Sequence, residues 1–133
     1  MKKYFNLSFT YLIIGLVSGV FFREYTKLNG FTEKTYLSII HPHALILGFI
    51  FFIIVLLLDK NFRISKINGF KSWIITYNIS LIYVIITMIA RGILQVKGMD
   101  FNGLSHIAGL GHAILAISLI WFWYIGNKAM KND

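Results

Sequence analysis

The four histidines are the side chains of this sequence that could do chemistry, because the chain contains no cysteine. They are His41, His43, His106 and His112. All four lie inside long stretches that carry no charged residue. An ionisable side chain in an apolar stretch is costly unless it has a partner, and imidazole ligates iron and copper. The pattern therefore favours metal ligation over the packing role that an isolated histidine usually has.

The stretches around the histidines predict membrane-spanning helices. Of the 133 residues, 57% are hydrophobic and 14% are charged, whereas soluble domains carry about 25% charge. Uncharged segments cover residues 4–22, 35–58, 72–90 and 101–127. A helix needs about 20 apolar residues to cross a bilayer. We therefore expect an all-α membrane protein of one domain (residues 1–133), with helices over residues 4–22, 36–58, 73–91 and 104–126.

The connections between these segments are short, so successive helices should be antiparallel and form an up-down bundle of four transmembrane helices. The net charge of +8 comes from Lys and Arg at the helix ends. More of them accompany the termini and the 59–71 loop than the other two loops, which places both termini in the cytoplasm. The positive-inside distribution of a membrane protein is enough to explain the net positive charge. We expect a multi-pass protein of the bacterial cytoplasmic membrane, in contact with the lipid bilayer and without a nucleic-acid partner.

The depth of each histidine in its helix selects a pair. The second and fourth helices enter the membrane from the same face. At 1.5 Å per residue, His43 lies ~10 Å and His112 ~12 Å from that face, whereas His41 and His106 lie at ~7 and ~3 Å. Two side chains at the same depth on different helices can bind one metal from opposite sides, as the axial ligands of a haem do. The spacing therefore predicts His43 and His112 as the ligand pair.

His41 stays open as a further candidate ligand. At ~100° per residue, His41 and His43 point ~200° apart, so a regular helix cannot aim both at one metal. Pro42 removes a backbone hydrogen bond and can kink the helix, which would re-aim His41. We keep His41 as a candidate metal ligand, and its alternative role is a hydrogen bond to a neighbouring helix.

Arg23 and Arg91 are candidates for binding the two carboxylates of a haem. Each follows an uncharged segment at the interface nearest the paired histidines. Arginine suits carboxylates because its guanidinium donates two parallel hydrogen bonds. We predict both as cofactor-binding residues, with simple anchoring of the helix ends as the alternative.

Four segments of the chain resemble a known family. They are GLVSGVFFREYTKLNGF, HPHALILGFIFFIIVLLLDK, ARGILQVKG and GLGHAILAI. Together they are similar to an uncharacterised family of small four-helix bacterial membrane proteins, a domain of unknown function grouped with the superfamily of haem-copper oxidase subunit one. His106 lies outside the family pattern. The resemblance implies the same ligands and nearby cations, namely His41, His43, His112, Arg23 and Arg91.

These observations lead to a functional expectation. We expect a membrane protein that binds haem b through two histidines in the outer leaflet. Two histidines leave no open position on the iron, which favours electron transfer or haem-based sensing over catalysis such as oxygen reduction. One alternative is a copper-binding protein that uses His41 and His43. Another is a metal-free structural or assembly partner of a respiratory complex, and we also consider a homodimer or a respiratory-chain partner for the haem protein.

Overall fold

The computed structural model describes residues 2–131 and is helical throughout this range apart from short connections. The element bounds are α1 Lys2–Leu28, α2 Leu37–His43, the π-helix η1 Ala44–Ile50, α3 Phe51–Phe62, the 3-10 turn η2 Ile64–Lys66, α4 Phe70–Val96 and α5 Asn102–Lys131. Elements α2, η1 and α3 follow one another without a gap and form a single rod over Leu37–Phe62. We call this rod the α2–α3 rod.

Four helices within the described residues are long and apolar enough to cross a membrane, and the α2–α3 rod counts as one of them. This confirms the predicted all-helical architecture, with four helices long and apolar enough to span, and it is compatible with a multi-pass membrane protein. The helices are longer than predicted: α1 continues to Leu28 and α5 continues to Lys131. Charged side chains at a helix end can reach water while the backbone stays helical. The helices therefore extend beyond the uncharged segments.

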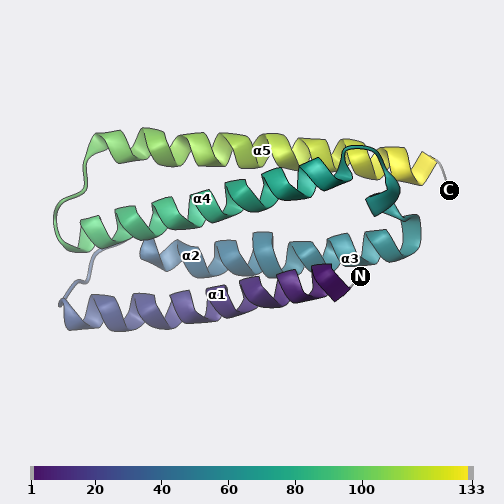
Figure 1. Cartoon of the computed structure of the whole chain (residues 1–133). Coiled ribbons are helices and arrows are strands. Elements are labelled where there is room, and N and C mark those ends of the chain that lie inside the picture. The colour runs from purple at the N-terminus through teal and green to yellow at the C-terminus, as the bar shows by residue number, and fades with distance from the viewer. Residues whose placement is uncertain (1, 132–133) are drawn as a thin grey trace.

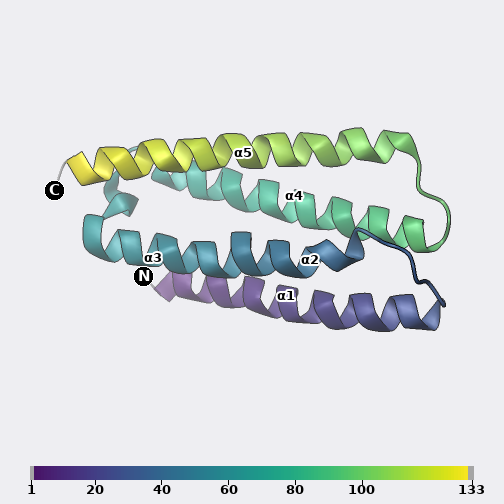
Figure 2. The same ribbon diagram turned by 180° about the vertical axis from the view of Figure 1, so that it is seen from behind.

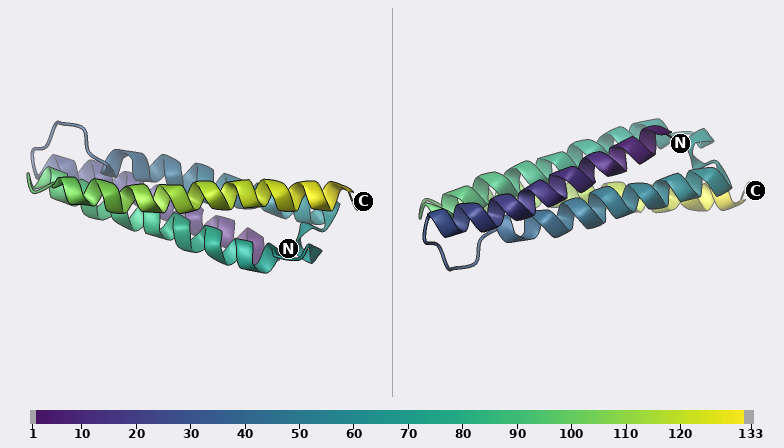
Figure 3. Two further views of the ribbon diagram at one scale, coloured as in Figure 1. Left: turned by 90° about the horizontal axis from the view of Figure 1, so that it is seen from above. Right: turned by 90° about the horizontal axis from the view of Figure 1, so that it is seen from below.

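Successive helices run antiparallel, with α1 and α5 on the outside of the α2–α3 rod and α4 (Figure 1, and from behind in Figure 2). The rod packs on α1 and on α4, and α5 packs mainly on α4. Both ends of the described chain lie at one end of the bundle (Figure 3), which we call the terminal end. The opposite end contains the α1–α2 and α4–α5 connections, and we call it the loop end. Which end faces the cytoplasm stays a prediction from the Lys and Arg distribution.

A cluster of aromatic side chains holds three of the helices together towards the terminal end. The rings of Trp73 and Phe122 stack with centroids 4.6 Å apart, and those of Phe51 and Tyr77 do the same at 4.6 Å. Trp73 is fully buried, and its indole N–H donates to the Ser118 carbonyl at 2.8 Å. A buried indole N–H needs such a partner. The cluster therefore fixes α3, α4 and α5 relative to one another.

Close helix contact near the loop end depends on a glycine. A Cβ built on Gly92 of α4 would lie 2.7 Å from the backbone nitrogen of Leu37 and 2.6 Å from its Cγ. Because backbone cannot move aside as a flexible side chain can, any larger residue at Gly92 must push the rod away from α4. Thr35 also donates to the Gly92 carbonyl at 3.0 Å. The start of α2 is thus seated directly on the α4 backbone.

We expect Gly92→Ala to destabilise the bundle by about 1–3 kcal/mol, the usual cost of overpacking. Gly109→Ala is the matched control, because a Cβ there meets nothing within 4 Å. The control should leave stability unchanged or raise it by up to ~1 kcal/mol, since Ala favours helix more than Gly does. Thermal unfolding of the detergent-solubilised protein measures both changes. Equal unfolding temperatures for the two variants would contradict this view of the α2–α4 contact.

Candidate metal centre

The helix that carries His41 and His43 changes its winding directly after them. Pro42 lies inside α2, and the backbone stays in the right-handed helical region at His43 (φ −62°, ψ −47°) and Ala44 (φ −64°, ψ −39°). The rod then continues as the π-helix η1. Proline leaves one carbonyl without its N–H partner, and π-turns inside α-helices are frequent at functional sites. The π-helix begins at Ala44, directly after the predicted ligand His43.

His43 and His112 lie against each other across the space between α2 and α5. Their ring centroids are 6.2 Å apart and their planes are nearly perpendicular, at 86°. His43 is half-buried and His112 is exposed on the bundle. The structure therefore brings together the two histidines that the depth argument paired.

Each of these two rings is hydrogen-bonded to its own helix. The Nδ1 of His43 lies 2.8 Å from the Ile39 carbonyl, and the Nδ1 of His112 lies 2.8 Å from the Ala108 carbonyl. A carbonyl oxygen can only accept, so Nδ1 carries the hydrogen in both rings and Nε2 keeps its lone pair. Metal-binding histidines commonly have their second ring nitrogen held in this way, which sets tautomer and orientation. Both side chains are thus prepared to ligate through Nε2.

His41 contacts a different helix. Its Nδ1 lies 2.8 Å from the Gly15 carbonyl of α1, and the Ser18 hydroxyl donates to the same carbonyl at 2.8 Å. A Cβ added at Gly19 would lie 3.3 Å from that same ring nitrogen, so His41 fills the space between α1 and α2. The structure therefore places His41 and His43 on different neighbours rather than at one shared point.

The protein ligands available at this place are few. Within residues 2–131, no group of three or more His, Asp or Glu side chains is arranged to hold a metal ion. His106 is exposed in the first turns of α5. The candidate centre therefore consists of two facing imidazoles, His43 and His112.

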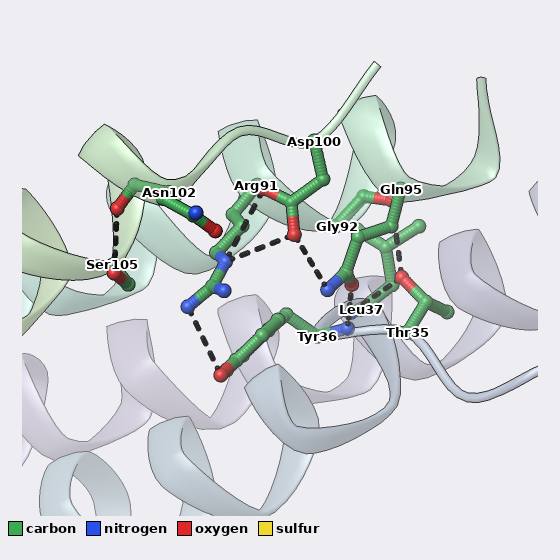
Figure 4. A network of polar contacts seen from close by, with 9 residues as sticks. All are labelled: Thr35, Tyr36, Leu37, Arg91, Gly92, Gln95, Asp100, Asn102 and Ser105. Carbon is green, nitrogen blue, oxygen red and sulfur yellow. Dashed lines mark hydrogen bonds and ion pairs between the residues drawn. The ribbon is translucent and has the colours of Figure 1, made fainter. Parts of the chain in front are cut away.

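Arg91 lies at the loop end in a network of polar contacts (Figure 4). Its Nε lies 3.2 Å from an Asp100 carboxylate oxygen, and its Nη1 donates to the Tyr36 hydroxyl at 3.0 Å. The guanidinium carbon also lies 4.4 Å from the centre of the Tyr36 ring, a cation–π contact. The Arg91 side chain is only 17% exposed. Its charge is therefore already paired with an acid and shielded from solvent.

Gln95 extends the same network. Its Oε1 accepts the Tyr36 backbone N–H at 2.9 Å, and its Nε2 donates to Asp100 at 3.1 Å. Figure 4 shows the first turn of α5 beside Arg91. The network thus joins the start of α2, the end of α4 and the α4–α5 connection. The sequence does not predict the roles of Tyr36, Gln95 and Asp100. Asp100 is, however, one of only five acidic residues and follows Arg91 by nine positions, which makes it a candidate partner.

Arg23 behaves differently from Arg91. Its side chain is 77% exposed and pairs with Glu24, the next residue of its own helix, at 2.8 Å. An exposed pair of this kind contributes little to stability. The Arg23 side chain therefore lies largely in the open at the loop end, and its role towards a cofactor stays a prediction.

The chain belongs to the DUF2871 family, which is described as a protein family of unknown function and matches residues 1–129. No curated protein and no solved structure shows detectable similarity to the chain. Family membership is thus consistent with the predicted resemblance to an uncharacterised family, while the grouping with haem-copper oxidases stays a prediction.

We expect Arg91→Gln to lower stability by about 1–3 kcal/mol, because the change leaves the partly buried Asp100 carboxylate without its charged donor. Arg23→Gln is the matched control, and it should have no measurable effect since its ion pair is exposed. Thermal unfolding in detergent distinguishes the two. If both variants unfold at the wild-type temperature, the network does not hold the loop end together.

Proposed function

We propose that this member of the DUF2871 family is a membrane b-type haem protein that acts in electron transfer or haem-based sensing. The observation that carries the proposal is the facing pair of His43 and His112, each with Nδ1 hydrogen-bonded to its own helix. When bound, haem supplies an iron that accepts and returns one electron. The chain supplies the two imidazoles and the apolar surroundings.

The separation of the rings supports this pairing. With metal–nitrogen bonds of ~2.0 Å and ~1.2 Å from nitrogen to ring centre, two imidazoles on opposite sides of one metal have centres about 6.4 Å apart. The observed separation is 6.2 Å. An imidazole can turn about its bond to the metal, so perpendicular planes are compatible with axial ligation.

The number of ligands also favours haem over a bare ion. Structural zinc sites take four protein ligands, and the described residues offer no group of three or more. Haem contributes four nitrogens of its own and needs only two axial ligands from the protein. If His43 and His112 both ligated the iron, no open position would remain on it for a substrate, which supports electron transfer or sensing rather than an enzyme.

The surroundings of the pair are proposed to be the outer leaflet of a bacterial cytoplasmic membrane. The Lys and Arg distribution places the terminal end in the cytoplasm, and the two histidines lie on the loop-end halves of their helices. Electrons would then be exchanged on the outer side, with a second copy of the chain or a respiratory-chain protein as partner. A relationship to haem-copper oxidase subunit one is part of this proposal.

Copper is the second candidate, because imidazole ligates copper as well as iron. It is favoured at His43 and His112 rather than at His41 and His43, since His41 is hydrogen-bonded to α1. A metal-free structural or assembly role is the third candidate, in which the rings of His43 and His112 form only an aromatic contact. The absorption spectrum distinguishes all three.

We expect His43→Ala and His112→Ala to abolish the split-band spectrum of six-coordinate low-spin haem, because each side chain supplies one of two axial ligands. His106→Ala is the matched control and should keep the wild-type spectrum, since this residue is exposed near the start of α5. His41→Ala should also keep the ligation, although loss of its bond to Gly15 will lower stability. A wild-type spectrum in the His112 variant would contradict two-histidine ligation. Loss of haem in the His41 variant alone would identify His41 as the ligand of this helix.

A further inference from the structure

The α2–α3 rod keeps one face buried along its length because its middle is wound as a π-helix. Its buried positions are Leu37, Ile40, Ala44, Gly48, Phe52 and Val55. The central positions are four residues apart three times in succession, and each such step turns a regular α-helix ~40° past a full turn. A regular helix would therefore rotate its buried face by ~120° across this region. The π-helix η1 lies at this place, and its wider winding absorbs the drift.

The winding of η1 also sets the direction of the His43 ring, because His43 and α3 lie on opposite sides of η1. Helix α3 is fixed by the fully buried Phe52 and by the stacking of Phe51 on Tyr77 at 4.6 Å. If η1 became α-helical while α3 stayed in place, His43 would turn by ~120° about the rod axis, by the same arithmetic. Such a turn would carry His43 away from His112. The facing pair therefore depends on the π-helical winding.

This winding leaves the Leu47 carbonyl without its usual donor. In a regular α-helix the Phe51 N–H would bond to Leu47, four residues back. Here that N–H bonds instead to the carbonyls of Ile46 and Gly48. The Tyr77 hydroxyl of α4 donates to the Leu47 carbonyl at 2.8 Å, and Tyr77 is fully buried. Because a buried carbonyl is costly to leave unpaired, this hydroxyl stabilises η1.

We propose that Tyr77 is a positioning residue of the candidate metal centre, whose hydroxyl stabilises the π-helical winding of η1 and thereby aims His43 at His112. The effect on a cofactor rests on the proposed haem function. The aim of the two side chains does not, and it can be measured without haem.

Tyr11 provides the matched control, because it contacts η1 in another way. A Cβ added to Gly48 would overlap the Tyr11 side chain, so this ring packs against the η1 backbone. Its hydroxyl donates to the Asn78 side chain of α4 at 3.0 Å. Tyr11→Phe and Tyr77→Phe each keep a buried ring and remove one hydrogen bond between helices. Of the two hydroxyls, that of Tyr77 is the one bonded to the η1 backbone.

The first measurement is a haem titration of the purified full-length protein. Tyr77→Phe should weaken haem binding about tenfold, the scale of one unpaired buried polar group. Part of the ferric haem should become high-spin, because His43 then fails to reach the iron in part of the molecules. Tyr11→Phe should keep the wild-type affinity and spectrum, although it also loses a hydrogen bond.

The second measurement needs no haem and uses the absence of cysteine from the chain. The double substitution His43→Cys and His112→Cys places the two thiols of the protein at the facing pair. A short bis-maleimide should join them in the haem-free protein. Adding Tyr77→Phe should slow this cross-linking about tenfold, whereas adding Tyr11→Phe should leave its rate unchanged.

Equal behaviour of the Tyr77 and Tyr11 variants in the cross-linking assay would overturn the inference, because Tyr77 would then act through packing alone. Weaker haem binding in Tyr77→Phe with an unchanged cross-linking rate would also overturn it, since the aim of the pair would not have changed. A wild-type protein that binds no haem would instead overturn the proposed function, and cross-linking would still decide whether Tyr77 aims the pair.

Discussion

The hydrogen bond from each imidazole Nδ1 to a carbonyl of its own helix is the interaction on which the candidate centre depends. A polar side chain on an apolar helix needs a partner within the protein if that helix crosses a membrane, and His43 and His112 have one four residues back along the chain. That bond fixes the tautomer, limits ring rotation and leaves the lone pair of Nε2 available. His41 satisfies the same need across the α1–α2 contact, and so it joins two helices instead of pointing into the gap beside α5.

Helix α4 sets the distance between the two histidines, because both of their helices pack on it. The start of α2 lies on Gly92, and α5 approaches so closely at Gly111 that an added Cβ would lie 2.5 Å from the Tyr83 ring. Tyr83 also donates to the Ile107 carbonyl of α5 at 3.1 Å. With the aromatic cluster at the terminal end and the Arg91 network at the loop end, the α2–α3 rod and α5 are held at both ends, and the rings of His43 and His112 meet between these two contacts.

Much of the fold could be predicted from the sequence, because long uncharged stretches leave few alternatives to spanning helices. The juxtaposition of His43 with His112 followed from equal depth on helices that enter from one face, while their role as ligands stays a prediction. The π-helix after Pro42 could not be foreseen, since no residue pattern marks where a helix loosens its winding. The pairing of Arg91 with Asp100 depends on how the α4–α5 connection turns back, which the sequence does not reveal. The sequence therefore predicts Arg91 as a cation available to a cofactor carboxylate, whereas the structure pairs its guanidinium with Asp100.

We propose that His43 and His112, whose ring planes are nearly perpendicular, hold one haem iron between them, and electron paramagnetic resonance of the oxidised protein is the decisive measurement. Two axial histidines predict a low-spin ferric signal, and perpendicular rings predict that its anisotropy is large. A purely high-spin ferric signal would contradict ligation by both histidines. A Cu(II) signal with nitrogen hyperfine structure, in protein free of haem, would replace haem with copper at the same two side chains.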